Sequence, residues 1–130
     1  MPVPVINLKA AFGRLEFFGQ RTPESAGEQL GAAFTSLSTY RDGDLFIGHY
    51  AGNSAWERHP SGDEIVMVIE GSADLILLEG HNEVRQRLEA GELLVVPRNV
   101  WHRFEVEAGV KVFTATPAPE EHSLTKPLDG

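Results

Sequence analysis

Two histidines and two glutamates stand at spacings that would let β-strands bring them to one point. Glu57 and His59 are two residues apart, Glu64 opens the next apolar segment, and His102 lies in a later one. Side chains two positions apart on a strand share a face, so Glu57 and His59 would project together. A barrel that closes these strands would gather all four side chains at one end of its interior. Two imidazoles and a carboxylate with open positions suit Fe(II), and Zn, Mn, Ni and Co are also open as choices.

The part of the chain that must position these groups has the regularly spaced turn residues of a β-protein. Between residues 33 and 116, turn residues separate short apolar segments, which are predicted to be strands over 33–41, 45–51, 65–69, 73–78, 83–88, 93–96, 101–106 and 110–116. Asp42-Gly43-Asp44 predicts a hairpin, while Glu70-Gly71-Ser72 and Ala108-Gly109 predict turns. Short strands at this spacing are typical of an antiparallel sandwich or barrel.

The N-terminal arm, residues 1–32, lies outside this predicted barrel. Asn7 can cap a short helix over 8–12, because its side chain can accept a hydrogen bond from the helix N-terminus. Thr22-Pro23-Glu24 resembles a second helix start, although two later glycines weaken any helix that follows. We therefore expect a short helical and irregular segment before the barrel.

The C-terminal tail, residues 117–130, is predicted to stay out of any central strand, because its prolines cannot donate to a sheet ladder. Two readings are open for His122 in this tail. It is either an ordinary tail residue or, if the tail folds over the barrel mouth, a residue delivered to the site. His81 lies in a predicted turn, and we expect it to be solvated.

The composition excludes several classes of protein. With 130 residues the chain is predicted to form one domain with its own core. The absence of cysteine excludes disulfides and thiolate metal sites. A formal net charge of -8 argues against nucleic acid as a partner. No apolar run approaches the ~20 residues of a membrane span, and no signal sequence is visible, so we expect a cytoplasmic protein without a membrane partner.

The first group of residues resembles the first of the two motifs of the cupin superfamily, G(X)5HXH(X)3-4E(X)6G. His59, Glu64 and Gly71 match its later positions at the right spacing. Glu57 occupies the position of the leading histidine, and Gly52 is displaced by one residue from the opening glycine. The departures put the number and type of metal ligands in question and leave the fold unaffected.

The second group resembles the second cupin motif, G(X)5PXG(X)2H(X)3N. Gly91, Pro97 and His102 match it. Asn99 stands at a glycine position, which its short polar side chain suits because asparagine tolerates a left-handed backbone. Val106 replaces the final asparagine.

The resemblance implies an all-β fold, the double-stranded β-helix or jelly-roll barrel, with its core over about residues 33–116. It also implies metal-dependent chemistry on a small organic molecule inside the barrel, with dioxygenase, isomerase and lyase reactions as the options. The alternative is a non-catalytic cupin that binds a sugar or small metabolite, with the metal structural or absent. A barrel that serves as a dimerising scaffold is a third reading.

Within such a site, His59, Glu64 and His102 are the expected ligands of one divalent metal, since a carboxylate buried beside two imidazoles requires a compensating cation. Three roles are open to Glu57: a fourth ligand, a general base beside an open coordination position, or a solvent-facing residue on the barrel lip. The residues expected on the pocket wall are His49, Val66, Val68 and Phe104. For His49 a role as ligand is the less favoured alternative. Trp56 and Trp101 are expected to pack, because each faces away from the adjacent ligand residue.

The strand predicted over Ile65–Ile69 is apolar on both faces. Its outer face therefore needs cover, either from the N-terminal segment or from another subunit. Because closed symmetric dimers are the commonest assemblies, we expect a homodimer.

Overall fold

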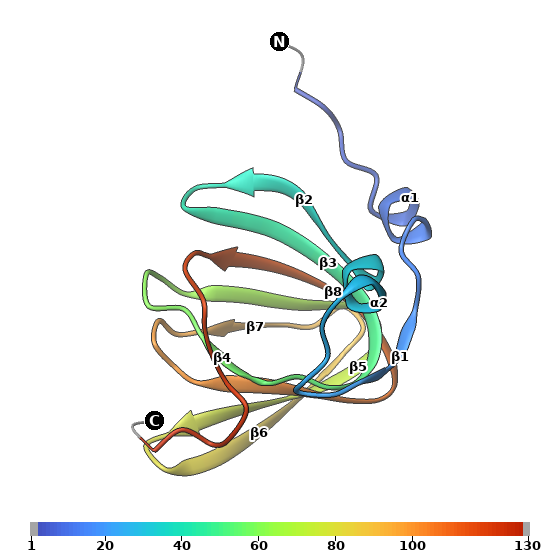
Figure 1. The fold of residues 1–130 in the computed structure, drawn as a ribbon. Coiled ribbons are helices and arrows are strands. Elements are labelled where there is room, and N and C mark those ends of the chain that lie inside the picture. The colour runs from blue at the N-terminus through green and yellow to red at the C-terminus, as the bar shows by residue number, and fades with distance from the viewer. Residues whose placement is uncertain (1–2, 129–130) are drawn as a thin grey trace.

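The computed structural model describes residues 3–128 (Figure 1). In chain order its elements are α1 (Leu8–Gly13), β1 (Phe18–Arg21), α2 (Glu28–Ala33), β2 (Phe34–Tyr40), β3 (Gly43–Asn53), β4 (Trp56–Arg58), β5 (Glu64–Glu79), β6 (Asn82–Glu89), β7 (Leu93–Val96), β8 (His102–Pro117) and β9 (Glu121–Ser123). The predicted all-β class, preceded by a short helix, is confirmed. Neither helix in the described residues is long and apolar enough to cross a bilayer.

β8 is the centre of the hydrogen-bonded sheet. It pairs antiparallel with β3 along one edge and with β5 along the other. β5 also pairs with β6 and β7, and β3 also pairs with β2. Figure 1 shows these strands curling around a shared interior. The predicted hairpin between β2 and β3 is confirmed, with Tyr40 opposite Gly43.

Two predicted turns are bends inside continuous strands. Breaks were predicted around Gly71 and Gly109, but β5 and β8 run through these positions. Gly71 has φ 79° and Gly109 has φ 141°, and a Cβ at Gly71 would lie 2.2 Å from the Gly109 carbonyl oxygen. Glycine adopts such backbone angles at low cost, so both strands bend here while their pairing continues with a shift in register.

The N-terminal arm contains one helix that was predicted and one that was misplaced. Asn7 Oδ1 accepts a hydrogen bond from the Ala10 amide at 2.9 Å, as expected of the α1 cap. The helix predicted to start at Thr22-Pro23-Glu24 is wrong, because Thr22 and Ser25 close a turn there. The Thr22 amide donates to the Ser25 hydroxyl and the Ser25 amide to the Thr22 carbonyl. α2 begins only after this turn, and β1, which pairs parallel with β3, was not predicted.

The inner and outer faces of the sheet are covered differently. Inside the barrel, Val66, Val68 and Leu75 are fully buried in the main core. Outside, α1 places Phe12 in a second cluster against which Ile69 packs. The arm therefore covers one end of the strand that is apolar on both faces.

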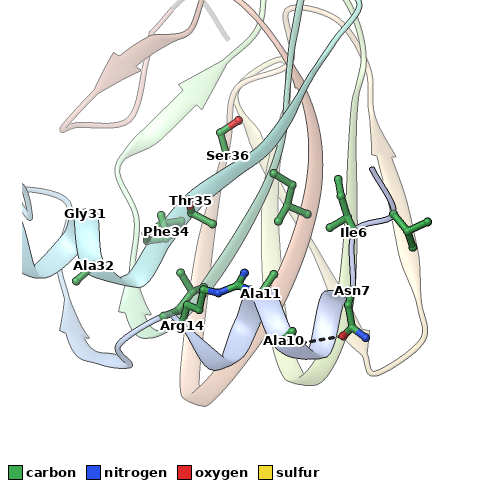
Figure 2. A pocket seen from close by; sticks show the side chains of 13 residues that line it. Ile6, Asn7, Ala10, Ala11, Arg14, Gly31, Ala32, Phe34, Thr35 and Ser36 are labelled. Carbon is green, nitrogen blue, oxygen red and sulfur yellow. Dashed lines mark hydrogen bonds between the residues drawn. The ribbon is translucent and has the colours of Figure 1, made fainter. Parts of the chain in front are cut away.

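The rest of this outer face is open. Ile65, Leu93 and Val95 are 39%, 56% and 46% exposed, and Ile65 is the direct ladder partner of Val95. A groove of about 550 Å³ lies between the arm with α1 on one side and the end of α2 and the start of β2 on the other. Figure 2 shows Ile6 and Ala10 on one side of this groove and Thr35 on the other.

Candidate metal centre

Three strand ends carry the four predicted site residues. Glu57 lies in β4, His59 follows the end of that strand, Glu64 begins β5 and His102 begins β8. Glu57 and His102 are direct partners in the β4–β8 ladder. In the turn before β8, Asn99 has φ 67°, the left-handed conformation expected of it, and its amide donates to the His59 carbonyl at 3.1 Å. This bond joins the two motif segments beside the site.

The structure brings the four side chains together. His102 Nε2 lies 3.0 Å from Glu64 Oε1 and 3.4 Å from Glu57 Oε1. His59 Nε2 lies 3.4 Å from Glu64 Oε1. One possible ligand atom from each residue lies within 4.8 Å of those of the others. A tetrahedral shell with bonds of ~2.1 Å spaces its ligand atoms by roughly 3.4 Å, so this spacing fits a small cation.

Outer hydrogen bonds fix which atoms face the centre. His102 Nδ1 lies 2.9 Å from the Val100 carbonyl, which can only accept, so Nδ1 donates and Nε2 faces the carboxylates. The Thr116 hydroxyl donates to Glu64 Oε2 at 2.6 Å, which leaves Oε1 toward the histidines. Hydrogen bonds of this kind orient the ligands in metal sites.

His59 is the residue that most needs a further partner. It is 3% exposed, yet within the described part of the chain neither of its ring nitrogens has a hydrogen bond. Its nearest carboxylate oxygens are Glu64 Oε1 at 3.4 Å and Glu120 Oε1 at 3.9 Å. An unpaired buried polar group costs about 1–3 kcal/mol. A cation bound between His59 Nε2 and the carboxylates would give this nitrogen a partner, so the donor set fits a divalent metal.

A cavity of about 490 Å³ adjoins these side chains. Glu57 and Glu64 line it, and so does Phe104. Val66 and Val68 lie in the barrel core and are not among its lining residues. The lining also includes Arg21, Leu30, Phe34, Phe46, Tyr50, Val112, Glu120 and His122. The site therefore opens onto a space that can hold a small organic molecule.

Known proteins share this arrangement of strands. The family model for the cupin domain matches residues 43–115. The chain belongs to the cupin family. A cupin-2 domain containing protein from Shewanella frigidimarina NCIMB 400 is similar over 92% of this cupin and 95% of its own chain, with a TM-score of 0.63 and 20% identity. A hydroquinone 1,2-dioxygenase, PnpCD, in complex with Cd2+ and 4-hydroxybenzonitrile, is similar over 65% of this chain and 63% of its own, with a TM-score of 0.55 and 16% identity. At such identities the likeness shows the fold.

Among curated proteins, the uncharacterized protein YdbB of Bacillus subtilis (strain 168) is 28% identical to this cupin over 68 residues. The match covers 52% of this chain and 58% of YdbB, so it spans less than two thirds of that relative.

Charge coupling inside the cupin site shifts the pKa values of His102 and Glu64 in opposite directions. Burial by itself lowers the pKa of His102, but hydrogen bonds to Glu57 and Glu64 outweigh it and raise the pKa to about 10. Burial by itself raises the pKa of Glu64, but hydrogen bonds to His102 and His59 lower it to about 2. In the metal-free protein at neutral pH, a protonated His102 therefore faces an ionised Glu64.

The C-terminal tail folds over the mouth of this cupin's barrel, which is the second of the two readings for His122. β9 pairs antiparallel with β4 and places His122 opposite Glu57. His122 Nε2 lies 3.8 Å from Glu57 Oε2 and 3.4 Å from Glu120 Oε2. The tail is anchored by the Ser61 hydroxyl, which donates to the Ala118 carbonyl at 2.7 Å. β9 is the last strand of its sheet, as expected for a tail kept out of central positions.

His49, expected on the pocket wall, lies instead on the outer face of β3. Its ring contacts Phe17, with 4.8 Å between centroids. Tyr50, the next residue, turns into the barrel core and lines the cavity. Ile47, two residues earlier on the same strand, packs with α1 outside the barrel. The two tryptophans expected to pack do so, in a cluster formed by Trp56, Ile76, Leu78 and Trp101.

Proposed function

We propose that this cupin is a metal-dependent enzyme that acts on a small organic molecule held in the 490 Å³ cavity. The ligands of the metal are Glu57, His59, Glu64 and His102. The observation that supports this most is the pair of unbonded, buried His59 nitrogens beside the Glu64 carboxylate. A divalent metal held there supplies a Lewis acid or an electron-transfer centre. Dioxygenase, isomerase and lyase reactions are the classes proposed.

The chain's own residues supply the rest of the chemistry. Glu57 and Glu64 present carboxylates to the cavity, while Phe104 and Val112 give it apolar walls that restrict water. Glu57 is less buried than the other three groups, so it is the one that can leave its position to take a proton from a substrate.

One observation favours a second function, a binding cupin with a structural metal. The cluster offers four protein donor atoms, and four protein ligands close a tetrahedral shell, whereas catalytic sites keep a position open. In this reading the cavity holds a sugar or small metabolite without reaction.

Metal content tests the proposed site. Protein purified without chelator should contain about one first-row divalent metal per chain by elemental analysis. His59→Ala should lose most of this metal, because it removes a ring nitrogen that lies beside the Glu64 carboxylate and makes no hydrogen bond to the described residues. His81→Ala is the matched control, since His81 is exposed in a turn, and it should keep the metal. A parent protein that binds neither its own metal nor added Mn2+, Zn2+ or Fe2+ would refute the site.

A crystal structure of the Zn2+-loaded protein separates the two functions. A water molecule bound to the zinc shows an open coordination position, whereas four protein ligands without a water show a closed tetrahedral shell. Glu57→Gln tests the role of Glu57. A loss of metal would identify Glu57 as a ligand, whereas retained metal with lost turnover would identify it as a general base.

We further propose that the protein is a homodimer located in the cytoplasm. The open apolar residues Ile65, Leu93 and Val95 support the dimer, because a patch of this kind on a sheet face is commonly covered by a second copy.

A further inference from the structure

Arg21 lies outside the family-matched segment, yet it lines the same cavity as Glu57 and Glu64. It ends β1, whose pairing sets Arg21 opposite Gly52 of β3. Gly52 has φ 109°, and a Cβ there would lie 2.1 Å from the Arg21 carbonyl oxygen. Only glycine lets the two backbones come this close, so the pairing with β3 fixes the position of the Arg21 backbone at the edge of the barrel.

Two aromatic rings of the cavity wall hold the Arg21 side chain. Its guanidinium carbon lies 4.7 Å from the centroid of the Tyr50 ring and 5.0 Å from that of Phe34. The two rings are neighbours, with 5.3 Å between centroids. Stacking uses the flat face of a guanidinium and leaves the N–H groups at its edge for a planar acceptor.

The charge of Arg21 is not neutralised by a protein carboxylate. Among the residues that the structure describes, Arg85 and Arg103 form ion pairs with carboxylates, whereas Arg21 forms none. Burial raises the pKa of Tyr50 well above its usual range, so its phenol stays protonated and adds no negative charge. A half-buried cation in a cavity wall, without a carboxylate partner among the described residues, is suited to an anion from solution.

We propose that Arg21 anchors a carboxylate of the ligand, and that the substrates of this cupin are small monocarboxylic acids with an apolar body. The guanidinium edge matches the two oxygens of a carboxylate. Leu30, Phe46 and Phe104 give the cavity its apolar surface. The carboxylate anchor deepens the proposed function and rests on it for the claim that the bound acid is a substrate.

The charges around the cavity favour one carboxylate over a phosphate or a diacid. Glu57, Glu64 and Glu120 also line the cavity. These carboxylates repel a second negative charge on the ligand, while Arg21 can compensate only one. The body of the ligand should therefore be uncharged.

The test compares phenylacetate with phenylacetamide, which have nearly the same shape and differ in charge. Isothermal titration is done on chelator-treated protein, so that a metal cannot bind the acid, and on metal-loaded protein. We expect the parent to bind phenylacetate about tenfold or more tightly than the amide, because a charge-assisted hydrogen-bonded pair is lost with the amide. Arg21→Gln should abolish this preference. Arg98→Ala, at an exposed arginine outside the cavity lining, should leave it unchanged.

The controls keep the outcome decisive. If Arg21→Gln does not fold, as judged by its thermal transition, Arg21→Lys replaces it; the lysine keeps the charge without the planar edge and should weaken the preference severalfold. A parent without any preference for the acid, or a preference that survives in the Arg21 variant, would overturn the anchor. Metal content is measured in the same samples. A preference that depends on Arg21, in a protein that takes up none of the added metals Mn2+, Zn2+ or Fe2+, would support the anchor and reject the proposed enzyme. Bound metal without the preference would do the reverse.

Discussion

At the scale of single residues, protons and metal compete for the same atoms. In the metal-free protein the pKa of His102 is raised, because hydrogen bonds to Glu57 and Glu64 outweigh its burial. A metal ligand must be a neutral imidazole, so the proton on Nε2 has to leave when the metal binds. The outer proton on Nδ1 stays with the Val100 carbonyl.

We therefore expect metal binding at pH 7 to release at least one proton per ion, since the pKa of the second imidazole ligand, His59, is also raised, and we expect the affinity to rise with pH below the raised pKa of His102. Calorimetric titration of Mn2+ in buffers with different ionisation enthalpies measures the proton count at fixed pH. A heat that is independent of the buffer, together with an affinity that does not change from pH 6 to pH 8, would contradict the protonated His102.

The same shifts act on the stability of the metal-free protein in opposite directions. The raised pKa of His102 stabilises the fold below its unfolded value of 6.5, and this contribution is lost as pH rises toward about 10. The lowered pKa of Glu64 stabilises the fold above its unfolded value of 4.5, and this contribution is lost as pH falls toward about 2. Both contributions are fully present only between about pH 4.5 and pH 6.5, so the ion cluster supports the fold best in that range, even without metal.

At the scale of elements, the bends of β5 and β8 depend on glycine. Gly71→Ala should destabilise the protein by more than the ~1–2 kcal/mol of a left-handed alanine, because the new methyl group would also meet the Gly109 carbonyl. Gly80→Ala is the matched control: its φ is 63°, but nothing lies within 4 Å of the added Cβ. Free energies of unfolding from urea titrations compare the two. Equal losses in the two variants would show that the contact at the bend has no energetic importance.

The sequence predicted most barrel strands, because alternating apolar residues and turn residues are local signals. The turns predicted at Gly71 and Gly109 were wrong, since glycine is found both in turns between strands and at bends inside a strand. β1 could not be predicted, because the apolar residues within 14–32 show no clear periodicity and the strand forms by pairing with the distant β3. Tertiary pairing also creates β9, which has only three residues.

Some residues of the candidate site could be predicted from local sequence, and others could not. Glu57, His59, Glu64 and His102 could be found from spacing, because strand alternation and short turns are encoded locally. The sequence could not decide whether His49 or Tyr50 faces the barrel interior, since both sides of that strand carry apolar residues. Arg21 comes from the arm, and Glu120 and His122 come from the tail. The chain ends reach the cavity only after folding, so no local pattern marked them.

At the scale of the whole molecule, two apolar features are without cover in the described chain. Ile65, Leu93 and Val95 form an open patch on the outer face of β5 and β7. The beginning of the arm extends away from the barrel (Figure 1), and Val3 and Val5 are 91% and 96% exposed. A second copy that packs on the β5–β7 face would bury this patch. Each Å² of apolar surface removed from water would stabilise the dimer by roughly 25 cal/mol.

We expect light scattering after size exclusion to give a mass about twice the 14.3 kDa of one chain at micromolar concentration. Leu93→Glu combined with Val95→Glu should shift the protein toward the monomer, because two charges on each copy would lose water at the interface without partners. Leu124→Glu is the control for added charge: Leu124 is 61% exposed in the tail and belongs to neither β5 nor β7, so its variant should remain a dimer. A parent mass near 14.3 kDa would reject the dimer. A dimer that survives both charges on the β5–β7 face would place the interface elsewhere, with the exposed arm as the next segment to shorten.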